Sequence, residues 1–182
     1  MAFDIKDRNI IFTGRAFQVN LLQMQLPNGK IRQYELIDHP GAVTIVPVDN
    51  EGNILFVTQF RVGAGKSLLE LPAGTLGKGE EPFHCASREI REETGMAAGE
   101  MKELGSFYLA PGYSSEYMHI FLATKLTHDP LPEDEDEFLE LTALPVEKAY
   151  QMATAGEIND GKTLAALLLA QPYIHDMKHD NR

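Results

Sequence analysis

The sequence predicts an α/β fold: a mixed β-sheet in an α/β/α sandwich, with an antiparallel β-hairpin region at the N-terminus. Two observations support this. Apolar, β-rich segments fill the first third of the 182-residue chain and return later, and amphipathic stretches with helical spacing lie between and after them. Strands interleaved with helices are typical of layered α/β/α domains. A chain of this length corresponds to one main domain, here expected over 41–182, with the hairpin region over 1–40.

The N-terminal strands are predicted from alternation and from turn residues. Residues 12–21 alternate partly with period two, and a turn at 27–30 separates them from the extended segment 31–37, so the two segments are expected to form a hairpin. Further strands are predicted over 41–48 and 54–60, joined by a short polar turn. Because no helix lies between this second pair, we expect them to be antiparallel neighbours.

The second half of the chain mixes helices and strands. A helix is expected to begin near Pro82, which suits a first turn, and to end at Gly95, which suits a C-terminal cap. Its side chains Phe83, Ala86 and Ile90 fall on one apolar stripe at helical spacing. The other predicted elements are strands over 104–109, 117–125 and 138–142 and helices over 146–155 and 163–170.

Charge and composition restrict the function class. The chain has 27 Asp and Glu against 16 Lys and Arg, a formal net charge of −11, so it is a poor candidate for binding nucleic acid or an anionic membrane by bulk charge. Divalent cations would still let it bind a polyanion. The longest apolar run, 164–170, is far shorter than the ~20 residues of a membrane span. With no signal peptide in its charged N-terminus and one cysteine, Cys85, interpreted as a packing residue, the chain is expected to be cytoplasmic.

Three carboxylates share one flank of the predicted helix that ends at Gly95. Glu89 lies three residues before Glu92 and four before Glu93, so the three side chains project from neighbouring turns. Arg88 lies four residues before Glu92 and can pair with it. Like charges this close repel one another unless a hard divalent cation such as Mg²⁺ neutralises them. On the carboxylate spacing alone, a solvated amphipathic helix is an equally good interpretation.

The segment 74–96 resembles the Nudix box. Gly74, Glu80 and the run 88–96 match that box at every defined position, with five residues after the glycine and seven after the glutamate. A chance match of this length is very rare at average residue usage. The resemblance implies the Nudix fold for the main domain.

The similarity extends beyond the box. Segments 59–61, 69–74 and 111–116 are similar to segments of ADP-ribose pyrophosphatases, and Pro111 stands where that subfamily has a proline. The N-terminal hairpin resembles the part that dimeric members exchange between subunits. The resemblance therefore implies a homodimer and covers most of the chain.

The resemblance also implies an activity. It indicates Mg²⁺-dependent hydrolysis of the pyrophosphate bond of ADP-ribose or a related nucleoside diphosphate sugar, which gives a nucleoside monophosphate and a sugar phosphate; Mn²⁺ is the alternative metal. GDP-mannose or another sugar nucleotide is the rival substrate. A rival of another class is a module that binds ADP-ribose without cleaving it, although such modules usually lose box glutamates. No nucleic-acid or membrane partner is expected.

Roles for single residues follow from the same resemblance. The implied metal ligands are the Ala73 carbonyl, Glu89, Glu92 and Glu93. Glu80 is a supporting acid, and Arg88, placed with Glu92 in the catalytic group, is an orienting ion-pair partner. The general base is expected in the acidic loop 133–138, where Glu137 fits the family pattern best and Glu135 second. A solvated charge run remains the alternative for that loop.

Substrate-binding residues are predicted from side-chain chemistry. Arg61 can fork onto a phosphate or ribose, and Glu116 can accept hydrogen bonds from sugar hydroxyls, with a structural salt bridge as the alternative for each. Glu70, from the 69–74 segment, completes this polar set. Phe17 and Tyr34 are candidates to stack on the base, because aromatic rings offer area at little entropic cost. Burial in the sheet core is the alternative for Phe17.

Overall fold

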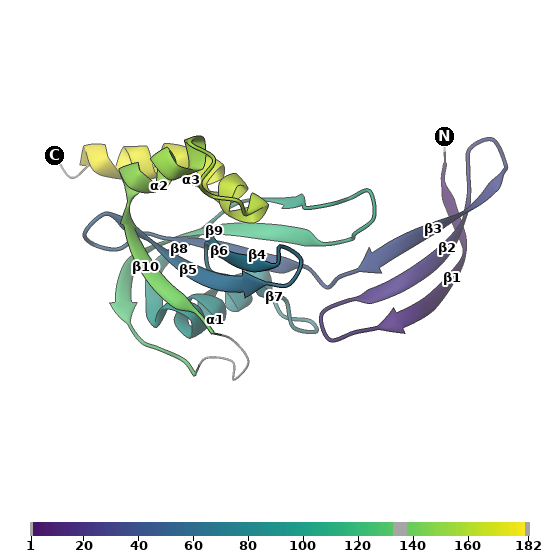
Figure 1. Cartoon of the computed structure of the whole chain (residues 1–182), viewed down its shortest axis with the longest axis horizontal. Helices are drawn as coiled ribbons and strands as arrows, with labels where there is room; N and C mark the ends of the chain where they lie inside the picture. Colours follow the sequence, from purple (N-terminus) through teal and green to yellow (C-terminus); the bar gives the residue numbers. More distant parts are fainter. Residues whose placement is uncertain (1, 133–137, 181–182) are drawn as a thin grey trace.

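The structure is a computed structural model that describes residues 2–132 and 138–180. A layered body of strands and helices lies at one end, and a separate antiparallel sheet extends from it (Figure 1). This arrangement confirms the predicted α/β fold with an N-terminal antiparallel region. None of the helices in the described residues is long and apolar enough to cross a membrane.

The N-terminal sheet has the order β1-β2-β3, built from β1 (Asp4–Thr13), β2 (Gln18–Gln25) and β3 (Ile31–Asp38), all antiparallel. The prediction of one strand over 12–21 is wrong, because a turn separates β1 from β2. At that turn the Gly14 amide donates to the Phe17 carbonyl at 2.9 Å. The predicted hairpin partner of 31–37 is therefore β2, and β1 adds a further strand.

Two further sheets form the body. The mixed sheet has the order β7-β4-β9-β8, in which β4 and β9 are parallel and the other pairs antiparallel. The second sheet is antiparallel with the order β10-β5-β6. The bounds of these strands are β4 (Ala42–Pro47), β5 (Asn53–Arg61), β6 (Lys66–Glu70), β7 (Ala73–Thr75), β8 (Met96–Tyr108), β9 (Tyr117–His128) and β10 (Glu140–Pro145).

The predicted antiparallel pairing of 41–48 with 54–60 is wrong. Their connecting turn is tight, but beyond the single bridge between Val48 and Ile54 the two strands enter different sheets. Strand β4 is buried along its whole length and takes β7 and β9 as its neighbours. A strand buried on both faces gains more from a central position than from staying beside the next strand in sequence.

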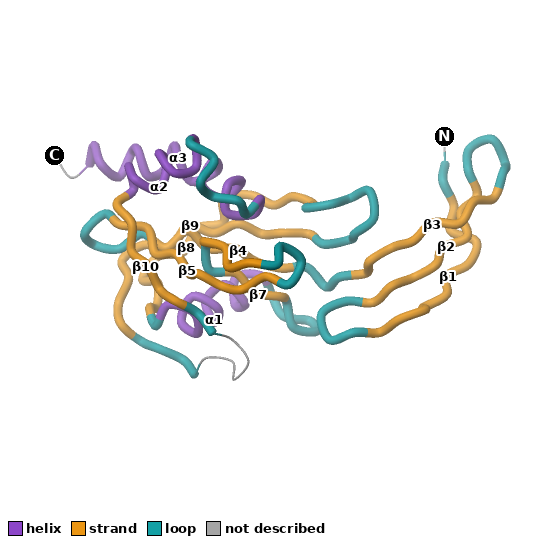
Figure 2. The backbone as a smooth tube through the Cα atoms, viewed as in Figure 1, coloured by secondary structure: helices purple, strands orange, loops and turns teal. Residues whose placement is uncertain are grey.

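Helices cover both faces of the mixed sheet. Figure 2 shows α1 (Pro82–Thr94) on one side and α2 (Val146–Thr154) and α3 (Gly161–Asp180) on the other. Alternate residues of β4 point to opposite faces, so Ile45 joins the apolar cluster under α1 and Val46 joins the cluster under α3. The predicted α/β/α layering is therefore present.

Several element bounds differ from the predictions for identifiable reasons. Strand β8 begins at Met96, well before the predicted 104, because pairing with β9 recruits a polar segment without clear alternation. Helix α3 continues past the predicted end at residue 170 and through Pro172, since Ala166, Ala170 and Ile174 bury one continuous stripe on both sides of the proline.

Candidate active site

Helix α1 presents two buried carboxylates on its inner face. The helix ends at Gly95, whose φ of 70° is the left-handed conformation typical of a C-terminal cap. Glu89 and Glu93 are only 8% and 7% exposed, on the same face as the buried Cys85 and Ile90. The expected apolar stripe is corrected in one position: Phe83 is half exposed, and Cys85 packs in the interior instead. Because burying a carboxylate is costly without compensation, these glutamates need polar or cationic partners.

The short strand β7 supplies part of that compensation. The Ala73 amide donates to Oε2 of Glu93 at 3.1 Å. A Cβ placed on the next residue, Gly74, would lie 1.8 Å from Cδ of Glu89. The carboxylates of Glu89 and Glu93 therefore lie directly against the backbone of β7, and only glycine leaves room for Glu89 at position 74.

Arg88 draws three of the glutamates together. Its Nε lies 3.1 Å from Glu80 Oε1, and its Nη1 lies 2.7 Å from Glu89 Oε1 and 2.6 Å from Glu92 Oε2. Hydrogen bonds to Glu80 raise the pKa of the guanidinium above its ordinary value, with further contributions from Glu89 and Glu92. The same contact with Arg88, followed by the amide of Gly77 at 2.8 Å, lowers the pKa of Glu80. The four side chains form one ion-pair network, as predicted for Arg88.

The donor set of this site fits a hard divalent cation. Carboxylate and carbonyl oxygens are the ligands that Mg²⁺ prefers, and Glu89 and Glu93 lie where Gly74 leaves the backbone accessible. Among the described residues, no group of three or more His, Cys, Asp or Glu side chains is arranged as a metal cluster. Arg88, bonded to Oε1 of Glu89, is the cation that pairs with this carboxylate in the structure.

A cleft of about 390 Å³ borders strand β7. It brings together predicted residues from distant parts of the sequence, since Arg61 from β5, Ala73 from β7 and Glu116 from the β8–β9 connection all line it. The full lining comprises Ala42, Arg61, Ala73, Gly74, Thr75, Leu109, Glu116, Met118, Asp160, Gly161 and Lys162. The cleft is thus an open pocket whose lining mixes polar and apolar groups, and its residues Ala73 and Gly74 contact the buried carboxylates.

Arg61 is held in that cleft by Glu70. Its Nε and Nη2 donate to the two carboxylate oxygens of Glu70 at 2.8 and 2.6 Å, and this bidentate bond raises the pKa of Arg61. Glu70 is 1% exposed and does not line the cleft. Its predicted place among the substrate-contacting residues is therefore corrected: Glu70 is buried and fixes the position of Arg61 through the bidentate bond.

Sequence reasoning missed the residues that begin α3. Asp160 and Lys162 line the cleft, and Lys162 forms ion pairs with both Asp160 and Glu70. The segment carried one local signal, because Asp160 precedes an apolar helical run and its Oδ2 accepts the Thr163 amide at 2.9 Å as an N-terminal cap. Lys162 lies 92 positions from Glu70, so no local pattern could place the two together.

The remaining predicted residues lie elsewhere. Phe17 and Tyr34 are 38% and 42% exposed on the N-terminal sheet, and neither lines the cleft of this chain. The alternative that Phe17 is buried in the sheet core is therefore wrong for this chain, and its ring contacts Phe12 at a centroid distance of 6.3 Å. The predicted general bases Glu137 and Glu135 lie outside the described residues.

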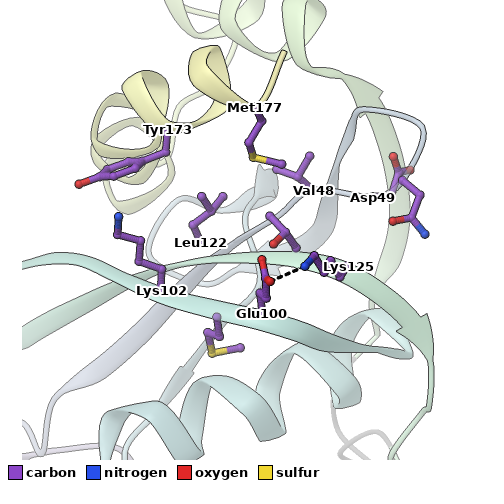
Figure 3. A pocket seen from close by; sticks show the side chains of 11 residues that line it. Val48, Asp49, Glu100, Lys102, Leu122, Lys125, Tyr173 and Met177 are labelled. Atoms are coloured by element: carbon purple, nitrogen blue, oxygen red, sulfur yellow. Dashed lines mark hydrogen bonds and ion pairs between the residues drawn. The ribbon is translucent and has the colours of Figure 1, made fainter. Parts of the chain in front are cut away.

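A larger cavity, of about 820 Å³, lies between α3 and the strands β8 and β9 (Figure 3). Its charged groups already have partners within it: Lys125 pairs with Glu100, and the ammonium of Lys102 lies 4.0 Å from the ring centroid of Tyr173. The box glutamates line neither this cavity nor the cleft, but Ala73 and Gly74, against which Glu93 and Glu89 lie, border the cleft and not this cavity. Charge and donor chemistry therefore favour the smaller cleft beside β7 as the functional site.

Comparisons with known proteins find matches over most of the chain. The family model described as NUDIX domain matches residues 38–167. The chain is 39% identical over 163 residues, 88% of each chain, to the ADP-ribose pyrophosphatase of Bacillus subtilis (strain 168). It is equally identical, with the same coverage, to the methanol dehydrogenase activator of Bacillus methanolicus. Among solved structures, an ADP compounds hydrolase superposes with a TM-score of 0.85 at 25% identity, covering 97% of this chain and 96% of that one, which confirms the predicted fold.

Proposed function

Since the chain belongs to the NUDIX domain family of hydrolases, we propose that it cleaves the pyrophosphate bond of ADP-ribose or a related nucleoside diphosphate sugar. The products are a nucleoside monophosphate and a sugar phosphate. One observation carries the proposal: two buried glutamates lie against the backbone of β7, and the residues of β7 line a cleft that also holds Arg61. This pairs a cation site with an anion-binding side chain, which a diphosphate substrate requires.

The proposed cofactor is Mg²⁺, with Mn²⁺ as the alternative; divalent metals are general in this family. The ligands would be the Ala73 carbonyl together with Glu89, Glu92 and Glu93. When bound, the ion neutralises the diphosphate and lowers the pKa of a coordinated water. Arg88 pairs with Glu89 and Glu92 and so holds two of these carboxylates close together.

The groups of the chain that face the substrate have distinct tasks. Arg61 uses Nε and Nη2 on Glu70, so its Nη1 is the nitrogen available to a phosphate oxygen. Glu116, which also lines the cleft, accepts hydrogen bonds from ribose hydroxyls. A bidentate partner behind Arg61 reduces the entropy that the side chain loses when it binds an anion.

The proposed general base is Glu137, with Glu135 second, although both lie outside the described residues. Replacing Glu137 by Gln removes the proton acceptor and keeps the size of the side chain. We expect kcat to fall strongly in this variant while the affinity for the metal changes little. If Glu137→Gln turns over substrate as fast as wild type, the general base is Glu135 or a box glutamate instead.

The proposed assembly is a cytoplasmic homodimer formed through the N-terminal sheet. All ten residues of β1 are exposed in the single chain, and its apolar side chains Ile5, Ile10, Ile11 and Phe12 are 50–53% exposed. Exposed apolar surface of this extent is typical of a surface that binds another protein chain. In such a dimer Phe17 and Tyr34 would stack on the base bound by the partner subunit. Sedimentation of the full chain tests the stoichiometry.

The activity is tested by measuring kcat/KM on ADP-ribose, ADP-glucose and GDP-mannose with Mg²⁺, using phosphatase-coupled phosphate release, and then repeating with EDTA. We expect the highest value for ADP-ribose and complete loss with EDTA. A higher value for GDP-mannose would support the rival sugar nucleotide. Saturable ADP-ribose binding without phosphate release from any substrate would support the non-catalytic binding module instead.

A further inference from the structure

The start of α3 is bonded to the segment that carries the active-site residues. Thr163 is fully buried; its Oγ1 accepts the Leu71 amide at 2.9 Å and donates to Asp160 Oδ2 at 2.6 Å. Lys162 adds an ion pair to Glu70 and another to Asp160, the latter at 3.0 Å. The segment 70–73 is therefore held by α3 on one side, while Glu93 of α1 holds the Ala73 amide on the other.

The side chains that meet here form a charge-balanced cluster. Arg61 and Lys162 contribute two positive charges, and Glu70 and Asp160 contribute two negative ones. The side chains of Glu70, Lys162 and Asp160 are only 1%, 12% and 15% exposed, whereas Arg61 is 39% exposed. Interactions among poorly solvated charges are stronger than at the surface, so the loss of one cation leaves an uncompensated negative charge beside the cleft.

We propose that Lys162 is a positioning residue for substrate binding: by sharing the Glu70 carboxylate, it keeps the Arg61 guanidinium available to an anionic phosphate of the substrate. This inference rests on the proposed function, because it takes a diphosphate as the ligand. An ammonium has three donors, of which two go to Glu70 and Asp160. Without Lys162, Glu70 keeps its ion pair with Arg61 but loses the one with Lys162, so the Arg61 guanidinium is held more tightly on Glu70 and is less available to the substrate anion.

The alternative is that Lys162 only anchors α3. The two roles predict different kinetics, because a change in the availability of Arg61 to the substrate acts on KM, whereas a distorted site lowers kcat. They also predict different coupling. If Lys162 acts through Glu70 and Arg61, its replacement has little effect once Arg61 is already absent.

The test compares K162M with K162R, R61M and the double variant R61M/K162M, with K148M as control for the loss of one surface lysine from α2. We expect K162M to raise the KM for ADP-ribose about tenfold while kcat falls less than about threefold, and K162R to recover most of the loss. The double variant should match R61M, and K148M should match wild type. Circular dichroism establishes that each variant is folded; if K162M is not, K162R and a K162Q variant carry the comparison.

Additive effects of K162M and R61M, or a fall in kcat with KM unchanged, would overturn the positioning role. Calorimetric titration of each variant with ADP-ribose in EDTA separates this inference from the proposed hydrolysis. Should wild type bind ADP-ribose but hydrolyse nothing, weaker binding by K162M still supports the role and equal binding overturns it. Should wild type do neither, both proposals fail.

Discussion

The carboxylate of Glu89 fills the space that a side chain at Gly74 would need: a Cβ on Gly74 would lie 1.8 Å from the carboxylate carbon of Glu89. The two residues come from β7 and α1, and Glu89 is 8% exposed. The glycine is therefore required by the close approach of a charged side chain to the backbone. This contact places a buried carboxylate against the β7 backbone that lines the proposed substrate cleft.

Gly74→Ala should displace the Glu89 carboxylate and lower kcat about 100-fold or more, because a methyl group cannot share its position. The fold should persist, since the side chain of Glu89 can move toward solvent. Steady-state kinetics across a Mg²⁺ titration measures the effect. Gly63→Ala is the matched control, because nothing lies within 4 Å of its added Cβ. Normal activity in Gly74→Ala would show that Glu89 is not needed where the structure places it.

Glu93→Gln should weaken metal binding and leave the fold intact. The amide oxygen of Gln can still accept the Ala73 N–H that Glu93 accepts at 3.1 Å, but the negative charge is lost. We expect the Mg²⁺ concentration for half-maximal activity to rise about tenfold or more. An unchanged Mg²⁺ requirement would remove Glu93 from the set of ligands.

Arg88→Met should make the protein depend on metal for stability. It removes the cation shared by Glu80, Glu89 and Glu92, and we expect the free energy of unfolding to fall by about 1–2 kcal/mol after allowance for partial solvent screening. Mg²⁺ should then raise the Tm of the variant more than that of wild type, because it neutralises the same carboxylates. The control is Arg91→Met on the same helix, which removes the ion pair between Arg91 and Asp129. This variant should show no enhanced response of its Tm to Mg²⁺.

The thiol of Cys85 should be unreactive in the native protein. The side chain is fully buried, and burial, followed by the nearby charges of Glu89 and Glu80, raises the pKa of the thiol to about 12. Both effects suppress the thiolate, which is the reactive form. We expect reaction with Ellman's reagent at about pH 8 to be at least about 100-fold slower in the native protein than in urea. Rapid native labelling would mean that the inner face of α1 opens frequently.

Asp49 should stabilise the β4–β5 turn in a pH-dependent manner. Burial alone would raise the pKa of Asp49, but hydrogen bonds from Asn53 and Glu51 outweigh it and lower the pKa. The stabilisation is therefore complete above the ordinary carboxyl pKa of about 4 and is lost as the pH falls through the lower folded-state value. Asp49→Ala should cost about 1–2 kcal/mol at neutral pH, measured by urea denaturation, and progressively less below about pH 4. A difference that does not change with pH would contradict this origin.

The prediction of α1 from sequence was correct at both ends because its signals are local. Pro82 and Gly95 set its limits through backbone geometry, and the spacing of Glu89 and Glu93 sets the face they share. The same local rules did not show that β4 and β5 enter different sheets. That choice depends on which partners bury β4 on both faces, and β9, one of those partners, lies more than 70 positions further along the chain.

The sequence by itself determined the box helix, its carboxylates and the family to which the chain belongs. Only the tertiary structure decided that Glu70 is buried and bonded to Arg61 rather than exposed in the cleft. It also decided that Lys162, 92 positions away, forms a second ion pair with Glu70. Spacing along a helix or strand fixes which side chains share a face. Which faces meet is decided by the burial of the whole core, to which every element contributes, so contacts between distant segments follow from packing.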